Sequence, residues 1–490
     1  ELERRSVQLA RVWRRAGLRA GDGVAILAEN TPWFHEIYWA AIRSGLYLTP
    51  VNRHLSAPEV AYIVRDCGAR AIVASANLVV VADAALHDNS VCAHRLVVGP
   101  ATSDFLSYDT ALAGESDEPF EDQPRGALMC YSSGTTGQPK GIRRALTGKQ
   151  IDDPTTAASI DLFVDVFGID ASTRYLSPAP LYHAAPLAWT AAVQALGGTT
   201  VIMETFDARR ALVALHDHRI THSQWVPTMF VRMLKLPAAD RLGLDLSHHR
   251  CAIHAAAPCP PEVKRQMVDW WGPILWEFYA GSEGNGATII SSEEWLSRPG
   301  SVGRPLFGVV HVCDDDGTEV AVGETGLVYF ELPGPAFVYH GDPDRTRDTR
   351  NPLHDRWTTI GDIGHVDHEG YLYLTDRRAF TIISGGVNIY PREIEDCLIM
   401  HPSIADVAVF GIPDADMGEA VHASIELARD VTPTADLDAA LIAFARQRLA
   451  GFKVPRSIDY VKSLPRMPTG KLDKQPLRER YWRQAPEVAG

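Results

Sequence analysis

The sequence predicts an α/β protein, with a large N-terminal domain of layered parallel α/β subdomains plus a small antiparallel β part, and a smaller C-terminal α+β domain. The chain has 490 residues, which is enough for roughly three units at about 150 residues each. Its first half alternates short apolar runs with amphipathic helical segments, which is typical of parallel α/β layers. After Gly300 short strands joined by turns take over, which indicates antiparallel hairpins.

The first half contains the apolar runs that we expect to be buried strands. These runs are residues 24–28, 71–74, 95–98, 201–203 and 220–226. Residues 1–15 are expected to form a helix, because Leu9 and Trp13 lie on its apolar side. Residues 33–44 are expected to form another helix, which Gly45 ends.

The second half is expected to contain hairpin strands and then a smaller α+β unit. The predicted hairpin strands are 309–313, 327–331 and 371–374, the predicted C-terminal strands are 407–410 and 423–427, and the predicted helix is 437–450. We place the boundary at Asp376-Arg377. The predicted domains are therefore residues 1–376 and residues 377–490.

Residues 175–203 carry no charge and are long enough to span a membrane. Prolines interrupt the start of this stretch, and Gly197-Gly198 reads as a turn into a strand. We therefore predict a buried helix over 187–196 followed by a core strand, and no transmembrane segment.

Charge and cysteine usage exclude several classes of function. The chain has 47 Lys and Arg against 61 Asp and Glu, a net charge of −14, which argues against sequence-independent nucleic-acid binding. Its seven cysteines form no CxxC pair, so we expect a reducing, cytoplasmic location and no structural zinc. Because the sequence begins at Glu1 without a methionine, we expect the natural N-terminus to lie upstream.

The segment Tyr131-Ser-Ser-Gly-Thr-Thr-Gly-Gln-Pro-Lys-Gly141 has the composition of a phosphate-binding loop. Its hydroxyls, its glycine-rich backbone and the Lys140 ammonium together suit an anionic polyphosphate. It is not the P-loop pattern, because no GxxxxGK[ST] is present. The alternative, a Ser/Thr/Gly surface loop, explains the glycines but not the preceding strand or the Pro-Lys-Gly end.

This segment resembles the phosphate loop of the adenylate-forming superfamily, which includes acyl-CoA synthetases, nonribosomal adenylation domains and luciferase-type enzymes. Five further motifs follow in the family's order, so the resemblance covers nearly the whole chain. It implies a C-terminal domain that is mobile. It also implies these nucleotide-binding residues: Ser132, Ser133, Gly134, Thr135, Thr136, Gly137, Lys140, Ala255, Ala256, Ala257, Tyr279, Ser282, Asp362 and Arg377.

Within this set, small residues at 255–257 would let a flat base lie against backbone, and Tyr279 would offer a ring for stacking. Glu283 is the carboxylate that the resemblance assigns to Mg²⁺, which prefers oxygen ligands. Family members usually show Tyr-Gly-x-Thr-Glu; this chain has Ala280, and Ser282 keeps the hydroxyl. Asp362 would accept hydrogen bonds from the two ribose hydroxyls. The alternatives are an exposed loop carboxylate for Glu283, a buried core aromatic for Tyr279 and a turn aspartate for Asp362.

The acid-binding side is expected to include His183, Trp225, Met229 and Gly281. His183 lies in a motif that the family places near the acyl entrance, and a core histidine is the alternative. An apolar stretch like the one around Trp225 and Met229 lies more often in a hydrophobic core than in a pocket. If it lines a pocket, it lacks a fixed charge for an amino acid's ammonium, which favours fatty, aryl or steroid-like acids.

The C-terminal motifs resemble the parts of the family that move between two half-reactions. Gly385 and Gly386 would leave room for the pantetheine arm of coenzyme A. The hinge position, normally Asp or Lys, is Ala379 here, and small residues absorb backbone rotation. Lys471 would bring a cation to the α-phosphate, and a surface lysine is the alternative.

These residues predict an ATP-dependent acyl-CoA ligase that uses Mg²⁺ and coenzyme A, with a small-molecule carboxylic acid as substrate. The expected catalytic residues are Lys471, Glu283 and Thr136, with Thr135, Thr136 and Lys140 stabilising the departing pyrophosphate. Two alternatives stay open: an amino-acid-activating or carrier-loading adenylation enzyme, and a non-catalytic nucleotide-binding relative. No nucleic-acid partner is expected, and a homodimer is left open.

Overall fold

A computed structural model describes residues 1–87, 89–132, 139–153, 158–334, 337–377, 380–414, 416–466 and 472–483, with backbone only for 132, 158–162, 376 and 377. The chain divides into two compact units. Unit 1 comprises residues 1–224, 243–252 and 337–343, and unit 2 comprises residues 225–242, 253–336 and 344–490. β12 (Cys251–His254) and α13 (Pro343–Asp348) have residues in both.

Unit 1 begins with a parallel sheet in the strand order β5-β4-β3-β1-β2-β6. Its strands are β1 (Gly23–Leu27), β2 (Tyr47–Val51), β3 (Ala69–Ser75), β4 (His94–Val98), β5 (Leu106–Ser107) and β6 (Ala127–Leu128). The predicted strands 24–28, 71–74 and 95–98 are confirmed as β1, β3 and β4. β2 was not predicted, and it contains Pro50, paired with Ile26 of β1.

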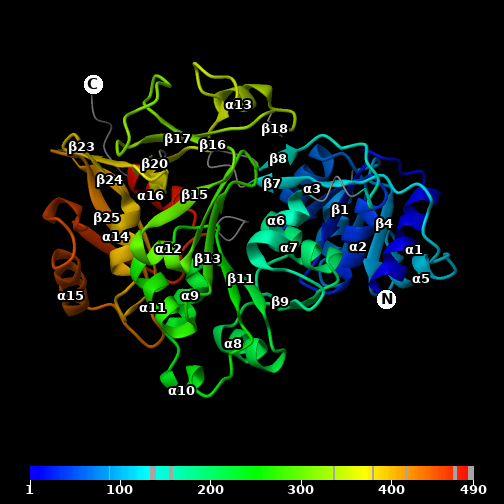
Figure 1. Cartoon of the computed structure of the whole chain (residues 1–490), viewed down its shortest axis with the longest axis horizontal. Helices are drawn as coiled ribbons and strands as arrows, with labels where there is room; N and C mark the ends of the chain where they lie inside the picture. The colour runs from blue at the N-terminus through cyan, green and yellow to red at the C-terminus, as the bar shows by residue number, and fades with distance from the viewer. Residues whose placement is uncertain are drawn as a thin grey trace. The chain divides into compact units, whose positions relative to one another are not determined.

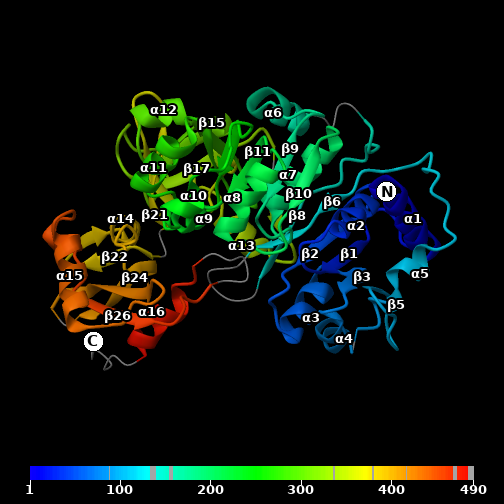
Figure 2. The same cartoon turned by 90° about the horizontal axis from the view of Figure 1, so that it is seen from below.

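Helices cover both faces of this sheet, because alternate residues of β1 face opposite ways. Val24 and Ile26 pack in one core cluster with α1 (Leu2–Arg15) and α2 (Trp33–Ile42). Ala25 and Leu27 pack in another with α3 (Ala57–Asp66) and α4 (Val79–Leu86). Figure 2 shows the two helix pairs on either side of the sheet. The predicted parallel α/β layer is thus confirmed.

The rest of unit 1 again combines parallel strands with helices. α5 (Tyr108–Leu112) packs beside α1. β9 (Arg174–Ser177) lies between β10 (Thr199–Ile202) and β11 (His222–Trp225), and both pair with it in parallel. The accompanying helices are α6 (Ala158–Phe167), α7 (Ala184–Ala195) and α8 (Ala208–Asp217). The predicted helix over 187–196 is confirmed as α7. Among the helices of the described ranges, none combines the length and the apolar character needed to cross a membrane.

A three-stranded sheet in unit 1 frames the predicted phosphate loop. β7 (Cys130–Ser132) pairs antiparallel with β8 (Lys140–Arg143), so Tyr131 lies opposite Gly141. β18 (Val338–Tyr339) pairs with the other edge of β8. The backbone N–H of His340 also donates to the carbonyl of Gly141 at 2.8 Å. A strand from far along the sequence therefore supports the end of the loop.

Unit 2 contains an antiparallel sheet, shown in green and yellow in Figure 1. Its strand order is β13-β14-β15-β21-β20-β17-β16, with β19 (Trp357–Thr358) paired to β17. The bounds are β13 (Leu275–Ala280), β14 (Ala287–Ser291), β15 (Ser301–Phe307), β16 (Val309–Cys313), β17 (Gly326–Glu331), β20 (Asp362–Val366) and β21 (Leu372–Arg377). The predicted antiparallel strands after Gly300 are confirmed. The helices are α9 (Pro227–Leu234), α10 (Ala238–Arg241), α11 (Pro261–Trp271) and α12 (Ser292–Ser297).

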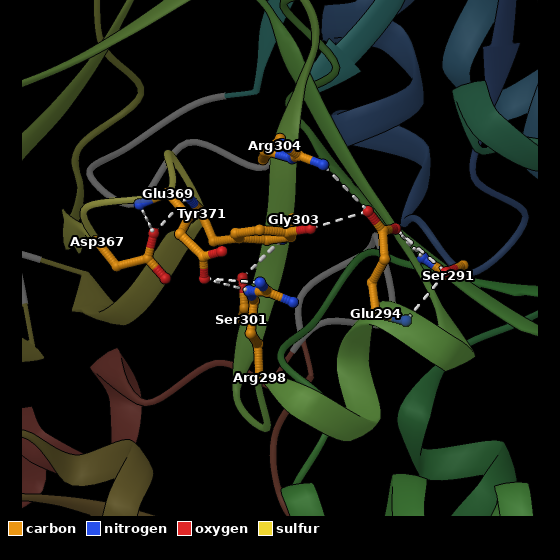
Figure 3. Close-up of polar contacts among 9 residues, drawn as sticks. All are labelled: Ser291, Glu294, Arg298, Ser301, Gly303, Arg304, Asp367, Glu369 and Tyr371. Atoms are coloured by element: carbon orange, nitrogen blue, oxygen red, sulfur yellow. Dashed lines mark hydrogen bonds and ion pairs between the residues drawn. The ribbon is translucent and has the colours of Figure 1, made fainter.

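A polar cluster ties α12 to the turn between β20 and β21 (Figure 3). The Tyr371 hydroxyl donates to Glu294 at 2.9 Å, and Glu294 also closes the capping box of α12 with Ser291. Arg298 forms an ion pair with Glu369 at 2.6 Å and stacks on the Tyr371 ring, its carbon Cζ 4.2 Å from the ring centroid. This cluster fixes the end of the sheet opposite to the start of β20, where Asp362 lies.

The C-terminal part of unit 2 is a mixed sheet with helices. Its elements are β22 (Ile382–Ser384), β23 (Val387–Ile389), α14 (Pro391–Leu398), β24 (Ile404–Asp414), β25 (Gly418–Leu427), α15 (Ala435–Arg446), β26 (Ser457–Val461) and α16 (Gln475–Trp482). β24 and β25 form a long antiparallel pair, and β26 joins β25 in parallel. The predicted strands 407–410 and 423–427 are confirmed, and the predicted helix 437–450 ends earlier, at Arg446.

Three buried histidines predict a loss of stability in mild acid. Burial lowers the pKa of His35 to about 4, and that of His249 and His254 to about 3. Below the ordinary histidine pKa of about 6.5 the unfolded chain binds protons that the folded chain excludes. The free energy of unfolding should therefore fall from pH 6.5 downward, by up to about 1.4 kcal/mol per pH unit for each histidine. Denaturant unfolding at pH 7.5 and pH 5 would measure this, and equal stability at both would contradict it.

Candidate active site

Tyr279 and Asp362 form the centre of the candidate site in unit 2. Tyr279 lies near the end of β13 and Asp362 begins β20, so strand ends distant in sequence bring them together. The Tyr279 hydroxyl donates to the Asp362 carboxylate at 2.6 Å. Asp362 is buried, and its backbone lies opposite Arg377 in the β20–β21 pair. Three residues of the predicted nucleotide set therefore come from one part of the sheet.

Glu283 and Asn285 follow β13 directly. Glu283 is 8% exposed and Asn285 is 1% exposed. A methyl group placed on Gly281 would lie 3.0 Å from Glu283 Oε2, 3.4 Å from Asn285 Oδ1 and 2.9 Å from Ile360. Glycine at 281 therefore keeps a small space open beside two oxygen atoms. Oxygen atoms of this kind are suited to a hard divalent cation.

The predicted base-binding segment 255–257 follows β12. Ala255 is buried, and its N–H donates to the carbonyl of Trp225 at 3.3 Å. Ala256 and Ala257 are exposed, and Ala256 has φ of +74°. A left-handed backbone costs an alanine about 1–2 kcal/mol, so the rest of the fold must hold this turn in place.

The predicted phosphate loop belongs to unit 1 and is described only at its ends. Lys140 Nζ lies 3.0 Å from Asp342 Oδ2. The Tyr131 hydroxyl donates to Asp66 at 2.5 Å, and burial together with the nearby acidic groups raises the pKa of Tyr131. Five predicted phosphate ligands lie outside the described residues: Ser133, Gly134, Thr135, Thr136 and Gly137. Ser132 is described by its backbone alone.

The residues predicted for the acid-binding side differ in exposure. Trp225 is 1% exposed and packs against Phe230 and Trp271, with ring centroids 6.2 and 5.5 Å away. Met229 is buried on α9. His183 is partly exposed at the start of α7, beside the ring of Tyr182 at 4.5 Å. The Trp225 side chain thus lies in an aromatic core, the alternative that the sequence left open.

The predicted coenzyme A residues form the turn between β22 and β23. Gly385 and Gly386 are exposed, with φ of +58° and +79°. The left-handed backbone at Gly385 favours glycine there, since any other residue would be strained. Ala379 and Lys471 lie outside the described residues, as does the Arg377 side chain. An isolated backbone bridge joins Arg466 to Leu472 on either side of the Lys471 segment.

A buried cluster of three titratable side chains, Lys264, Glu277 and His254, was not predicted from the sequence. Lys264 Nζ lies 2.7 Å from Glu277 Oε2, and His254 Nε2 lies 3.7 Å from the same oxygen. All three side chains are buried. Burial alone would raise the pKa of Glu277, but the Lys264 ammonium holds it below its ordinary value. The trio links α11 and β13 to the end of β12, the elements that lead into the site segments.

Sequence reasoning also missed Asn285 and Asp342. Asn285 lies two positions after Glu283, so an amide oxygen close to a predicted metal ligand was the available signal. Asp342 is about 200 residues from Lys140, and no sequence pattern connects them. Only the pairing of β18 with β8 brings them together.

The chain matches two family models: AMP-binding enzyme over residues 1–340, and AMP-binding enzyme C-terminal domain over residues 393–471. It is 32% identical to a feruloyl-CoA synthase from Amycolatopsis sp, over 98% of this chain and 93% of the relative. It is 31% identical to the fatty acid–[acyl-carrier-protein] ligase ScoC from Streptomyces coeruleorubidus, over 98% and 91%.

Among solved structures, ATP-bound MatB from Rhodopseudomonas palustris matches with a TM-score of 0.81 and 28% identity, over 98% of this chain and 93% of that chain. The expected fold, a large AMP-binding domain with parallel sheets followed by a C-terminal domain with a mixed sheet, is confirmed. Over nearly its whole length the chain is similar to acid–CoA ligases, and it belongs to the AMP-binding enzyme family.

Proposed function

We propose that the chain activates a carboxylic acid with ATP as an acyl-adenylate and then transfers the acyl group to coenzyme A, releasing pyrophosphate and AMP. The observation that supports this most directly is the Tyr279–Asp362 hydrogen bond, together with the buried Glu283 and Asn285 side chains that follow the same strand. An aromatic ring, a carboxylate for vicinal hydroxyls and two further oxygen atoms together suit a nucleotide and its cation. A feruloyl-CoA synthase at 32% identity supports the same reaction class.

The reaction needs groups that stabilise negative charge, because the acid carboxylate and the phosphate that it attacks are both anions. The carboxylate oxygen bonds to the α-phosphorus, and the bond from that phosphorus to pyrophosphate breaks. Lys471, Lys140 and the hydroxyls of Thr135 and Thr136 would stabilise the charge that develops. Asp362 would hold the ribose, with the Tyr279 hydroxyl fixing the orientation of its carboxylate.

Glu283 would hold Mg²⁺, which neutralises phosphate charge when bound. Among the residues in the described ranges, no group of three or more His, Cys, Asp and Glu side chains could hold a metal ion. A cation at Glu283 would therefore be shared with phosphate oxygens, which is the ordinary arrangement for Mg²⁺ with nucleotides.

We expect Asp362→Asn to weaken AMP binding by about 10- to 100-fold, because hydrogen bonds to a charged acceptor contribute about 1.5–3 kcal/mol. Calorimetry with AMP and 2′,3′-dideoxy-AMP would test the assigned role. The wild-type chain should prefer AMP strongly, and the preference should be much smaller in the variant, whose neutral amide oxygen is a weaker acceptor. A wild-type chain that does not distinguish them would disprove the ribose assignment.

The proposed substrate class is an apolar carboxylic acid: fatty, aryl or steroid-like. A pocket lined by the apolar side chains of α9, which carries Met229, would suit such an acid. The proposed domains are residues 1–376 and 377–490, with Ala379 as the hinge and Gly385-Gly386 on the coenzyme A side. ScoC is named as an acyl-carrier-protein ligase, which favours a carrier protein as the alternative acceptor.

Pyrophosphate release over a panel of short, long, aromatic and sterol side-chain acids tests the proposal. An active acid should release pyrophosphate without coenzyme A, and AMP release should then require free coenzyme A. AMP release that needs a carrier protein instead would favour the alternative acceptor. Nucleotide binding without pyrophosphate release from any acid would point to a non-catalytic relative.

A further inference from the structure

The Asn285 side chain has one satisfied end and one unsatisfied end. Its Nδ2 donates to the backbone carbonyl of Thr358 at 3.1 Å, which fixes the orientation of the amide. Its Oδ1 is buried and accepts no hydrogen bond from any described residue. The residue as a whole is 1% exposed. An unsatisfied buried acceptor costs about 1–3 kcal/mol, so a group that satisfies it is favoured at this place.

The unsatisfied oxygen faces the same space as the Glu283 carboxylate. A methyl group on Gly281 would lie 3.4 Å from Asn285 Oδ1 and 3.0 Å from Glu283 Oε2, so both oxygens border the volume that Gly281 leaves open. The remaining close neighbour is the apolar Ile360 side chain. Asn285 Oδ1 is an acceptor, so the group that satisfies it must be a cation or a hydrogen-bond donor, and a cation there would also lie close to the Glu283 carboxylate.

A divalent cation is the occupant that this chemistry favours. Magnesium binds carboxylate and amide oxygens, and it keeps further positions for phosphate oxygens and water. An Asn oxygen adds a ligand without adding charge, so it does not repel the triphosphate. We propose that Asn285 Oδ1 and the Glu283 carboxylate together bind the divalent cation that accompanies the nucleotide. This inference rests on the proposed function, which assigns a nucleotide to this region.

A purely structural role for Asn285 makes a different prediction. If the residue only ties its loop to Thr358, the important atom is Nδ2, and Asn285→Asp should damage the site as much as Asn285→Leu. If Oδ1 binds the cation, Asn285→Asp keeps an oxygen and adds charge, whereas Asn285→Leu removes the oxygen at similar volume. The two substitutions therefore separate the two roles.

The test measures Mn²⁺ binding by the electron paramagnetic resonance signal of free Mn²⁺, with α,β-methylene-ATP bound to the full chain. Asn285→Leu should weaken Mn²⁺ binding about tenfold, as losses around metal sites commonly do. Asn285→Asp should bind Mn²⁺ at least as tightly as the wild-type chain. Nucleotide affinity measured without a divalent cation should be the same in all three proteins.

Asn351→Leu is the matched control for damage to the fold. Asn351 is 2% exposed, and its Oδ1 accepts from the N–H groups of Leu353 and His354. This control should lower the melting temperature and leave Mn²⁺ affinity unchanged. Equal weakening in the Leu and Asp variants of residue 285, or no change in either, would overturn the inference while leaving nucleotide activation intact. A wild-type chain that binds no nucleotide analogue would overturn the proposed function itself.

Discussion

Replacing Lys471 with alanine should slow adenylate formation by about 10²–10³-fold, which is the usual cost of removing one preorganised group that stabilises developing charge. The lysine is proposed to neutralise charge where the acid attacks the α-phosphorus. It has no such task once the adenylate exists. Thioester formation from a supplied acyl-adenylate should therefore proceed at close to the wild-type rate.

Separate assays of the two half-reactions measure this difference. Pyrophosphate release reports the first, and thioester formation from synthetic acyl-adenylate and coenzyme A reports the second. Lys462→Ala is a suitable control, because Lys462 is an exposed lysine of the same C-terminal region. Equal losses in both half-reactions would contradict the role assigned to Lys471.

Replacing Lys264 with methionine should lower the free energy of unfolding by about 3–5 kcal/mol, because it leaves the Glu277 carboxylate charged and buried without its partner. The Lys264 side chain is fully buried, and its ammonium lies 2.7 Å from Glu277 Oε2. Denaturant unfolding measures the change. The exposed pair Arg347–Asp344 is the comparison, where Arg347→Met should cost less than about 1 kcal/mol.

The double variant Lys264→Met with Glu277→Leu should recover most of this loss. Replacing both members of a buried ion pair with apolar residues of similar volume is often neutral or stabilising. If the double variant is as unstable as the single one, the loss comes from packing and not from an unpaired charge. His254, 3.7 Å from the same carboxylate oxygen, stays in place in both variants.

Much of the fold follows from local patterns in the sequence. The apolar runs of β1, β3 and β4 and the charge-free helix α7 have the expected spacing, and the structure confirms them. β2 escaped prediction because it contains Pro50, and proline within a run argues against a strand. Pairing with strands on both sides overrides that local signal.

The candidate site was partly predictable for a different reason. Tyr279 and Asp362 were found through the order of motifs, and the structure places the Tyr279 hydroxyl 2.6 Å from the Asp362 carboxylate. Asn285 and Glu277 carry no motif. Their importance comes from burial and from the neighbours that tertiary pairing supplies, and neither property can be read from spacing along the chain.

The membership of β18 in unit 1 limits how the chain can be divided. Residues 337–343 belong with residues 1–224, although two segments of unit 2, residues 225–242 and 253–336, lie between them in the sequence. A fragment that stops before residue 337 would lack both the strand that pairs with β8 and the carboxylate of Asp342 beside Lys140. During synthesis, the neighbourhood of this lysine can be completed only after the ribosome has passed residue 342.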